Sequence, residues 1–261
     1  MITLQKKLNV VVTAGASGIG KMTVKTFVEQ GCNVFVCDIS QEHIDAFKLE
    51  FPEVFISKAD VANYEEVQHF FKEVSKQVDA IDVLVNSAGI AGPTARLEDV
   101  DPADWSQTMA INVNGMFHCL KEAIPLIKKS EQGSIVNIAS SASFYGFPFR
   151  SPYTAAKWAT IGMTKTLAME LGPQGIRVNA ICPGSVSGER IDRVIKADAE
   201  EQNKTIEEIK SVYVKQVSMR TFVEPDDVAN LILFLASPMG RFISGQAIGL
   251  DGHTEGLSTE L

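Results

Sequence analysis

Short apolar runs rich in β-branched residues alternate along the chain with longer stretches in which apolar positions recur at a helical period. The apolar runs are unbroken, as expected for strands of a parallel sheet that helices cover on both faces. The predicted strands are Leu8–Thr13, Asn33–Cys37, Val54–Ser57, Ile81–Val85, Ser134–Ala139, Ile176–Ile181 and Gln246–Leu250.

The amphipathic stretches between these runs predict helices. The last of them opens with Glu224-Pro225-Asp226-Asp227, which places a proline and acids where a helix N-terminus favours them. The alternation predicts an α/β fold: a doubly wound sheet of about seven mostly parallel strands with helices on both faces, in a single domain over residues 1–261. The predicted helices include Lys21–Glu29, Tyr64–Lys76, Trp105–Lys128, Tyr153–Leu171 and Pro225–Ala236.

One long segment, residues 188–222, interrupts this alternation. It carries two charged helical patterns, around Arg190–Gln202 and Thr205–Ser218, with no strand between them. An insertion of this length after a sheet strand is more often a functional lid than a plain connection, so we expect it to cover a substrate. The alternative is a solvated helical hairpin.

Composition and charge exclude several classes of protein. The 261 residues carry 24 Lys and Arg against 32 Asp and Glu, a formal net charge of −8. Phosphate groups would repel that charge, which argues against a general nucleic-acid or anionic-membrane binder. No apolar run approaches the roughly 20 residues that span a bilayer, and the N-terminus predicts a core strand rather than a signal peptide. The four cysteines lack zinc spacing, so we expect no metal and, by default, a cytoplasmic location.

A turn of small residues joins the first predicted strand to the first helix. It reads Thr13-Ala14-Gly15-Ala16-Ser17-Gly18-Ile19-Gly20, which lets backbone N–H groups approach a pyrophosphate at a helix N-terminus. Asp38 ends the second strand, where a carboxylate can accept both ribose hydroxyls of an adenosine and would repel a 2′-phosphate. Ile39 follows, with no Arg or Lys to receive such a phosphate. The sequence therefore predicts a Rossmann-like dinucleotide site that favours NAD over NADP.

A second constellation predicts proton transfer. Tyr153 and Lys157 lie four residues apart, on one face of a predicted helix. A phenol has a reference pKa of about 10, and a neighbouring ammonium lowers it toward the range useful for a general base. Ser140, thirteen residues upstream of Tyr153, follows the carboxyl end of a strand, where open α/β sheets bind their ligands.

These motifs, between Leu8 and Gly252, resemble those of the short-chain dehydrogenase/reductase family. Its TGxxxGxG turn is matched at Thr13, Gly18 and Gly20, with Ala14 in place of the first glycine. We expect that methyl group to be tolerated if the backbone φ at Ala14 is negative. The resemblance implies cofactor contacts at Thr13, Gly15, Ser17, Gly18, Ile19, Gly20, Asp38, Ile39, Asp60, Val61, Asn86, Ala88, Gly89, Tyr153, Lys157, Pro183, Gly184, Val186 and Ser187.

The resemblance also implies catalytic roles. In this family a Tyr transfers the proton, a Lys holds the nicotinamide ribose and lowers the Tyr pKa, a Ser orients the substrate oxygen, and an Asn anchors a proton-relay water. These roles fall to Tyr153, Lys157, Ser140 and Asn112, with Asn114 and Ser141 as the weaker alternatives. The implied reaction is a reversible hydride transfer between NAD and a secondary alcohol or ketone, in a homotetramer or dimer.

The segment from Cys182 to Gly188 resembles the family's PG motif, whose backbone and a following Thr hold the nicotinamide carboxamide. Gly188 stands at the position of that Thr, so the hydrogen bond must come from Ser187, from the Val186 backbone or from water, or be missing. Gly188 is also a candidate hinge for the lid. We expect Cys182 to be a neutral packed side chain.

Substrate walls in this family come from the segment between the Ser and the Tyr, from the loop after residues 86–89 and from the lid. Aromatic residues 144–149 either line an apolar pocket or pack at a subunit interface. Arginines near the predicted pocket suggest an anionic substrate, such as a hydroxy acid, sugar acid or sulfonate, touched by Ser140, Arg150 and Arg190. For any one of these arginines alone, an exposed or salt-bridged side chain is the simpler interpretation. The arginines in question are Arg96, Arg150, Arg190, Arg193 and Arg220.

Two other functions share parts of this pattern. One is a reductase of 3-oxoacyl thioesters, carried on acyl carrier protein or CoA, although biosynthetic reduction usually draws on NADPH. The other is a non-catalytic protein that senses dinucleotides, which the complete set of four catalytic positions disfavours.

Overall fold

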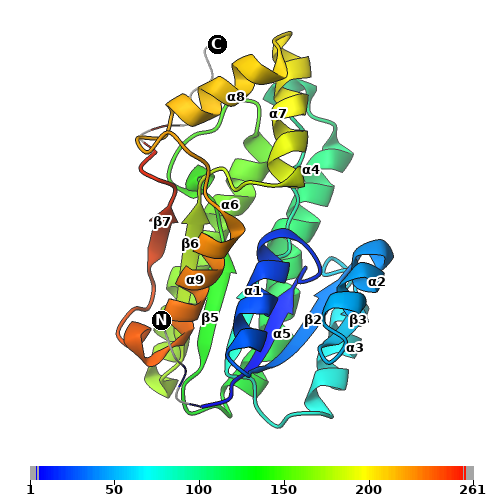
Figure 1. Ribbon diagram of the computed structural model, residues 1–261, viewed down its shortest axis with the longest axis vertical. Coiled ribbons are helices and arrows are strands. Elements are labelled where there is room, and N and C mark those ends of the chain that lie inside the picture. The colour runs from blue at the N-terminus through cyan, green and yellow to red at the C-terminus, as the bar shows by residue number, and fades with distance from the viewer. Residues whose placement is uncertain (1–3, 5, 255, 257–261) are drawn as a thin grey trace.

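Figure 1 shows the computed structural model, which describes residues 4, 6–254 and 256. Seven strands form one sheet: β1 (Asn9–Thr13), β2 (Asn33–Asp38), β3 (Phe55–Lys58), β4 (Val83–Asn86), β5 (Ser134–Ile138), β6 (Arg177–Pro183) and β7 (Ala247–Leu250). Their order is β3-β2-β1-β4-β5-β6-β7, and every neighbouring pair is parallel. The predicted doubly wound α/β fold is confirmed.

Helices cover both faces of the sheet (Figure 1). Helices α1 (Gly18–Glu29), α2 (Gln41–Glu50) and α9 (Pro225–Ala236) bury their apolar sides in one core cluster. Helices α3 (Tyr64–Ser75), α5 (Gly115–Ile127) and α6 (Ser151–Leu171) bury theirs in a second cluster on the opposite face. None of the helices in the described part of the chain is long and apolar enough to cross a membrane.

The sheet register gathers the polar residues at one edge. Strand β1 lies between β2 and β4, where the strand order reverses. Thr13 and Asn86 end β1 and β4, and Asp38 ends β2, so all three lie at the carboxyl edge of the sheet. Ligands of open α/β sheets bind at this reversal point.

Two local differences from the sequence prediction concern helices. The single helix expected over Trp105–Lys128 is divided into α4 (Pro102–Met109), a π-helical turn (Ala110–Asn114) and α5. Helix α2 was not predicted, although Ser40 caps it by accepting a hydrogen bond from the backbone N–H of His43. Most of its residues are polar, so the sequence does not clearly indicate the apolar side, on which Ile44 and Phe47 are buried.

The segment expected to be a lid folds as two helices, α7 (Glu189–Gln202) and α8 (Ile206–Lys215), beyond the carboxyl ends of the strands (Figure 1). They share a small apolar cluster, against which Phe147 and Ala91 pack. Gly188 is the N-cap of α7, and its φ of 130° lies in a region that side-chain-bearing residues rarely adopt. Such a backbone conformation favours glycine at position 188. That the segment covers a substrate stays a prediction.

The backbone at Ala14 does not meet the condition under which its methyl group was expected to be tolerated, a negative φ. Its φ is +50°, in the left-handed region, because the chain turns sharply between β1 and α1. Left-handed backbone costs an L-residue roughly 1–2 kcal/mol, which the turn must absorb.

We therefore expect Ala14→Gly to raise the free energy of unfolding by about 1 kcal/mol, after the larger entropy of glycine in the unfolded chain is subtracted. Urea denaturation measures the change. Ala16→Gly in the same turn, where φ is not positive, is the matched control and should lower stability. No gain at position 14 would contradict the strain argument.

Candidate active site

Three polar side chains meet beyond the carboxyl end of β5. Tyr153 and Lys157 lie on one face of α6, with the Lys157 Nζ 5.7 Å from the centre of the Tyr153 ring. The Ser140 hydroxyl acts on the Tyr153 phenol and lowers its pKa. Lys157 Nζ also donates to the carbonyl oxygen of Ile138 at 2.8 Å, which ties the ammonium to the end of the strand. The structure thus brings together three residues from positions 140, 153 and 157.

The electrostatic environment lowers the pKa of Tyr153. Burial alone raises it, but the positive charges of Lys157 and Arg190, the Ser140 hydroxyl and the charge of Arg150 together outweigh that effect. A phenol with a lowered pKa exchanges protons more readily near neutral pH. Burial likewise lowers the pKa of Lys157, while the neighbouring Tyr153 opposes that shift.

Asn112 lies in the π-helical turn, a feature that often marks functional sites. Its Oδ1 accepts from the Ile90 N–H at 2.7 Å, and its Nδ2 donates to the Ile90 carbonyl at 3.0 Å. Asn112 is buried, whereas Asn114 is exposed. The geometry favours Asn112 over its competitor.

The turn between β1 and α1 is shaped for close approach. A Cβ on Gly20 would lie 2.1 Å from the Ala14 carbonyl oxygen, so only glycine allows this packing of helix on turn. Ser17, the N-cap of α1, is extended, and its side chain makes no capping hydrogen bond in the described structure. The backbone N–H groups of the first helical turn are thus free of a side-chain acceptor and fit a phosphate.

Asp38 is buried at the end of β2 and is held from two sides. Its Oδ2 accepts from the Ala16 N–H at 3.1 Å, and its Oδ1 accepts from the Ser40 N–H at 3.0 Å. Each carboxylate oxygen keeps a further lone pair for a hydroxyl donor. Ile39 beside it is 57% exposed and offers no positive charge. These residues fit an adenosine ribose that carries free hydroxyls.

A chain of hydrogen-bonded polar side chains runs from β4 through β5 to α6. Asn86 Nδ2 donates to Asn137 Oδ1, and Asn137 Nδ2 donates to Thr164 Oγ1, both at 2.9 Å. Asn86 Oδ1 is buried and has no hydrogen-bond partner within the described structure, as expected of an atom kept for a ligand. Thr13 Oγ1 accepts from the N–H groups of Ser87 and Ala88, which joins β1 to β4. Sequence reasoning missed Asn137 and Thr164, since they form no short-range motif.

The segment after β6 holds the candidates for binding the nicotinamide carboxamide, and which of them binds it stays a prediction. The Ser187 hydroxyl donates to Glu224 Oε1 at 2.8 Å, beside the start of α9, and its oxygen can still accept a hydrogen bond. Val186 pairs with Val223 in an isolated parallel bridge. Burial raises the pKa of Cys182 to about 11, which agrees with a neutral packed thiol.

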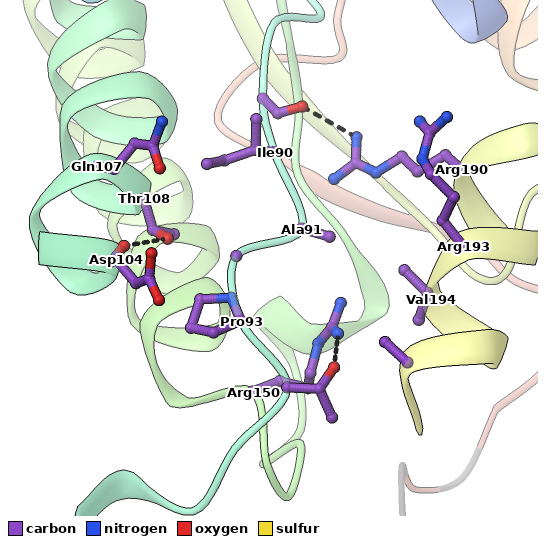
Figure 2. Close-up of a pocket in the computed structure, with 14 residues that line it drawn as sticks. Ile90, Ala91, Pro93, Asp104, Gln107, Thr108, Arg150, Arg190, Arg193 and Val194 are labelled. Carbon is purple, nitrogen blue, oxygen red and sulfur yellow. Dashed lines mark hydrogen bonds between the residues drawn. The ribbon is translucent and has the colours of Figure 1, made fainter. Parts of the chain in front are cut away.

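A cleft of about 610 Å³ opens between α4, the loop 89–94 and α7 (Figure 2). Asp104, Gln107 and Thr108 of α4 line one side. Arg190, Arg193 and Val194 of α7 line the other, and the loop with Ile90 and Pro93 runs between them. The cleft therefore has a cationic wall supplied by the predicted lid.

The five candidate arginines occupy different environments. Arg190 donates to the Gly89 carbonyl at 3.3 Å, and its guanidinium carbon lies 5.9 Å from the centre of the Tyr153 ring. Arg193 lines the cleft and forms an exposed ion pair with Glu189 at 3.6 Å.

The contacts of the other three arginines differ from those expected of side chains that bind a substrate anion. Arg150 lines the cleft but is buried and paired with Asp198 at 3.8 Å, as the salt-bridge alternative had it. Arg96 lies over the Phe149 ring, and Arg220 donates to the Lys215 carbonyl. Neither Arg96 nor Arg220 lines the cleft.

Comparisons with known proteins agree with this geometry. A family model described as enoyl-(acyl carrier protein) reductase matches residues 13–254. A 3-oxoacyl-[acyl-carrier-protein] reductase FabG of Thermotoga maritima is 35% identical over 246 residues, which cover 92% of this chain and 95% of that relative. An actinorhodin polyketide ketoreductase structure with NADPH has a TM-score of 0.90 and 28% identity, covering 96% of this chain and 98% of that one. An NAD⁺-bound xylitol dehydrogenase has a TM-score of 0.89 and 28% identity, covering 95% and 98%.

Fold, site and relatives define an oxidoreductase that uses a nicotinamide dinucleotide and acts on CH–OH or keto groups. The chain belongs to the short-chain dehydrogenase/reductase family. The alternative of a non-catalytic dinucleotide sensor finds no support in these comparisons.

Proposed function

We propose that the protein is an NAD(H)-dependent oxidoreductase that interconverts a secondary alcohol and a ketone, with Tyr153 as the general acid and base. The observation that carries the proposal is the meeting of Tyr153, Lys157 and Ser140 at the carboxyl edge of the sheet. The lowered pKa of Tyr153 supports the acid–base role, since a group tuned toward neutral pH transfers protons efficiently.

In the oxidative direction, the Ser140 hydroxyl orients the substrate oxygen and the Tyr153 phenolate accepts the hydroxyl proton. Lys157 stabilises that phenolate through its charge. Asn112 holds the backbone of Ile90, which fixes the loop beside the catalytic residues. A nicotinamide dinucleotide would be held by the turn 13–20, Asp38, Asn86 and Lys157. When bound, it would accept the hydride.

The preference for NAD is part of the proposal, since one similar structure contains NADPH and another NAD⁺. Asp38 supports NAD because a 2′-phosphate would meet a buried carboxylate. The exposed neighbour Ile39 offers no compensating cation.

We further propose an anionic secondary alcohol as substrate, bound through Arg190 and Arg193. Both arginines line the cleft, and Arg190 also lies beside Tyr153. A guanidinium donates two parallel hydrogen bonds to a carboxylate or sulfonate, which gives it geometric selectivity for such anions.

The hydride-transfer step is tested with a secondary alcohol that carries deuterium on its carbinol carbon. Mass spectrometry follows the label after incubation with NAD. We expect deuterium on the reduced cofactor and one molecule of ketone formed for each molecule of cofactor reduced. Deuterium released to water instead would contradict direct hydride transfer.

Arg190→Gln should raise KM for anionic alcohols by about 10–100-fold, the range of one lost charge-assisted contact, and leave KM for neutral alcohols within about threefold. The rise of the oxidation rate with pH should also move to higher pH, because the Arg190 charge lowers the pKa of Tyr153. Arg96→Gln, outside the cleft, is the matched control. An equal loss for anionic and neutral alcohols would contradict the anion-binding role.

A reductase of 3-oxoacyl thioesters is the second candidate, favoured by the 35% identical relative of that name. It predicts NADPH-dependent reduction of a 3-oxoacyl-CoA. Comparable turnover of a short 3-oxoacyl-CoA with NADPH would favour this candidate over the first.

The proposed working unit is a homotetramer or dimer in the cytoplasm. Exposed Phe117 on α5 and Trp158 on α6 support self-association, since large apolar side chains exposed on helix faces often mark interfaces. Light scattering coupled to size-exclusion chromatography measures the mass; a monomer would contradict the proposal.

A further inference from the structure

A buried polar cluster joins the predicted lid to the catalytic helix. It contains Arg150, the residue before the first turn of α6, Asp198 of α7, Tyr213 of α8 and Thr94 of the loop after β4. Arg150 and Asp198 are each 3% exposed, and Tyr213 is 6% exposed. Four segments far apart in the sequence thus share one site.

Asp198 is the centre of the cluster. Its Oδ1 accepts from Thr94 Oγ1 at 3.1 Å and lies 3.8 Å from Arg150 Nη1. Its Oδ2 accepts from the Tyr213 hydroxyl, and Arg150 Nη1 also donates to Thr94 Oγ1. Burial and the adjacent carboxylate raise the pKa of Tyr213, so its hydroxyl stays a donor.

The cluster is continuous with the catalytic residues through two routes. Along the chain, Arg150 precedes Tyr153 by three residues, and its guanidinium carbon lies 5.9 Å from the centre of the Tyr153 ring. Through the loop, Thr94 belongs to the segment whose Ile90 is held by Asn112 and whose Gly89 accepts from Arg190. The loop 89–94 is therefore fastened at three points around the cleft.

We propose that Asp198 is a positioning residue for the reaction: by holding Arg150, Thr94 and Tyr213 together, it docks α7 and α8 over the cleft and sets the substrate-binding wall beside Tyr153. Arg150 then serves the lid, and the substrate anion is left to Arg190 and Arg193. The inference rests on the proposed function for its effect on catalysis, whereas the docking of the helices stands independently of it.

The energetics of the cluster fit a positioning role. Desolvating two charges costs about as much as their attraction returns, so a buried ion pair adds little net stability. Removing one partner leaves an uncompensated buried charge, which the structure relieves by opening locally. Here the element able to open is the pair α7 and α8, because its own apolar cluster is small.

The first test is hydrogen–deuterium exchange of Asp198→Asn, which keeps the shape of the side chain and removes its charge. We expect exchange in residues 189–215 to quicken about tenfold or more, and exchange in α1 and α9 to stay unchanged. Glu201→Gln removes the same charge from an exposed position on α7 and is the matched control. Unchanged exchange in 189–215 would overturn the proposal, whatever the enzyme turns over.

Steady-state kinetics separates positioning from mere stability. Asp198→Asn should raise KM for the alcohol about tenfold, with kcat and the dissociation constant of the dinucleotide each within about threefold of wild type. Tyr213→Phe deletes only one hydrogen bond to Asp198 and should give a smaller change of the same kind; it also serves if Asp198→Asn does not fold. Equal KM values for wild type and Tyr213→Phe, with unchanged exchange in 189–215, would contradict the proposal.

Discussion

Tyr153→Phe is expected to abolish alcohol oxidation almost completely, lowering kcat on the order of 10²–10⁴-fold, the range supplied by a positioned general base. The phenol is the group that Ser140, Lys157 and two arginines surround, and its lowered pKa depends on them. Removal of one oxygen leaves the ring in place, so packing around α6 changes little. Initial rates of cofactor reduction at saturating alcohol measure the loss.

Two controls make this result specific. The dissociation constant of the dinucleotide, from its fluorescence on titration, should stay within about threefold of wild type, since the phenol is not the main binding group. Tyr145→Phe removes a phenol from the same segment; its hydroxyl donates to the Thr254 carbonyl. Loss of turnover in Tyr145→Phe but not in Tyr153→Phe would overturn the assignment.

The second large effect concerns the choice of cofactor. The double variant Asp38→Asn/Ile39→Arg should reverse the preference, shifting the ratio of kcat/KM for NAD over NADP by about 10²–10⁴-fold, which corresponds to roughly 3–6 kcal/mol. Asparagine removes the charge that repels a 2′-phosphate and still offers an oxygen to the N–H of Ala16 or Ser40. Arginine at the exposed position 39 supplies a fork of donors for the phosphate.

Ile39→Arg alone separates the two contributions. With Asp38 intact, the new arginine pairs with the carboxylate as well as with a phosphate, so the single variant should shift the ratio by less than half as much on a logarithmic scale. A wild type that already prefers NADP would contradict the role given to Asp38.

The sequence was sufficient for the fold because each strand is a compact apolar run and each long helix has a clear period. The proximity of Tyr153, Lys157 and Ser140 was also predictable, since Tyr153 and Lys157 are local neighbours and Ser140 follows a strand end. The backbone details were not: the left-handed φ at Ala14 and the π-helical turn at Asn112 depend on tertiary packing.

The polar cluster around Asp198 lay beyond sequence reasoning for a different reason. Its members stand at positions 94, 150, 198 and 213, and no short-range spacing relates them. In the sequence, Arg150 stands out only because it lies three residues before Tyr153, a position that predicts a substrate contact. Its partner is Asp198, which the packing of α7 against the loop after β4 brings to it.

The most direct test of the proposed function measures NADH formation from NAD and NADPH formation from NADP across matched anionic and neutral secondary alcohols, with wild type and Tyr153→Phe side by side. We expect turnover of anionic alcohols with NAD by the wild type and almost none by Tyr153→Phe. Turnover confined to NADP, with a 3-oxoacyl thioester as the best substrate in the reverse direction, would contradict it.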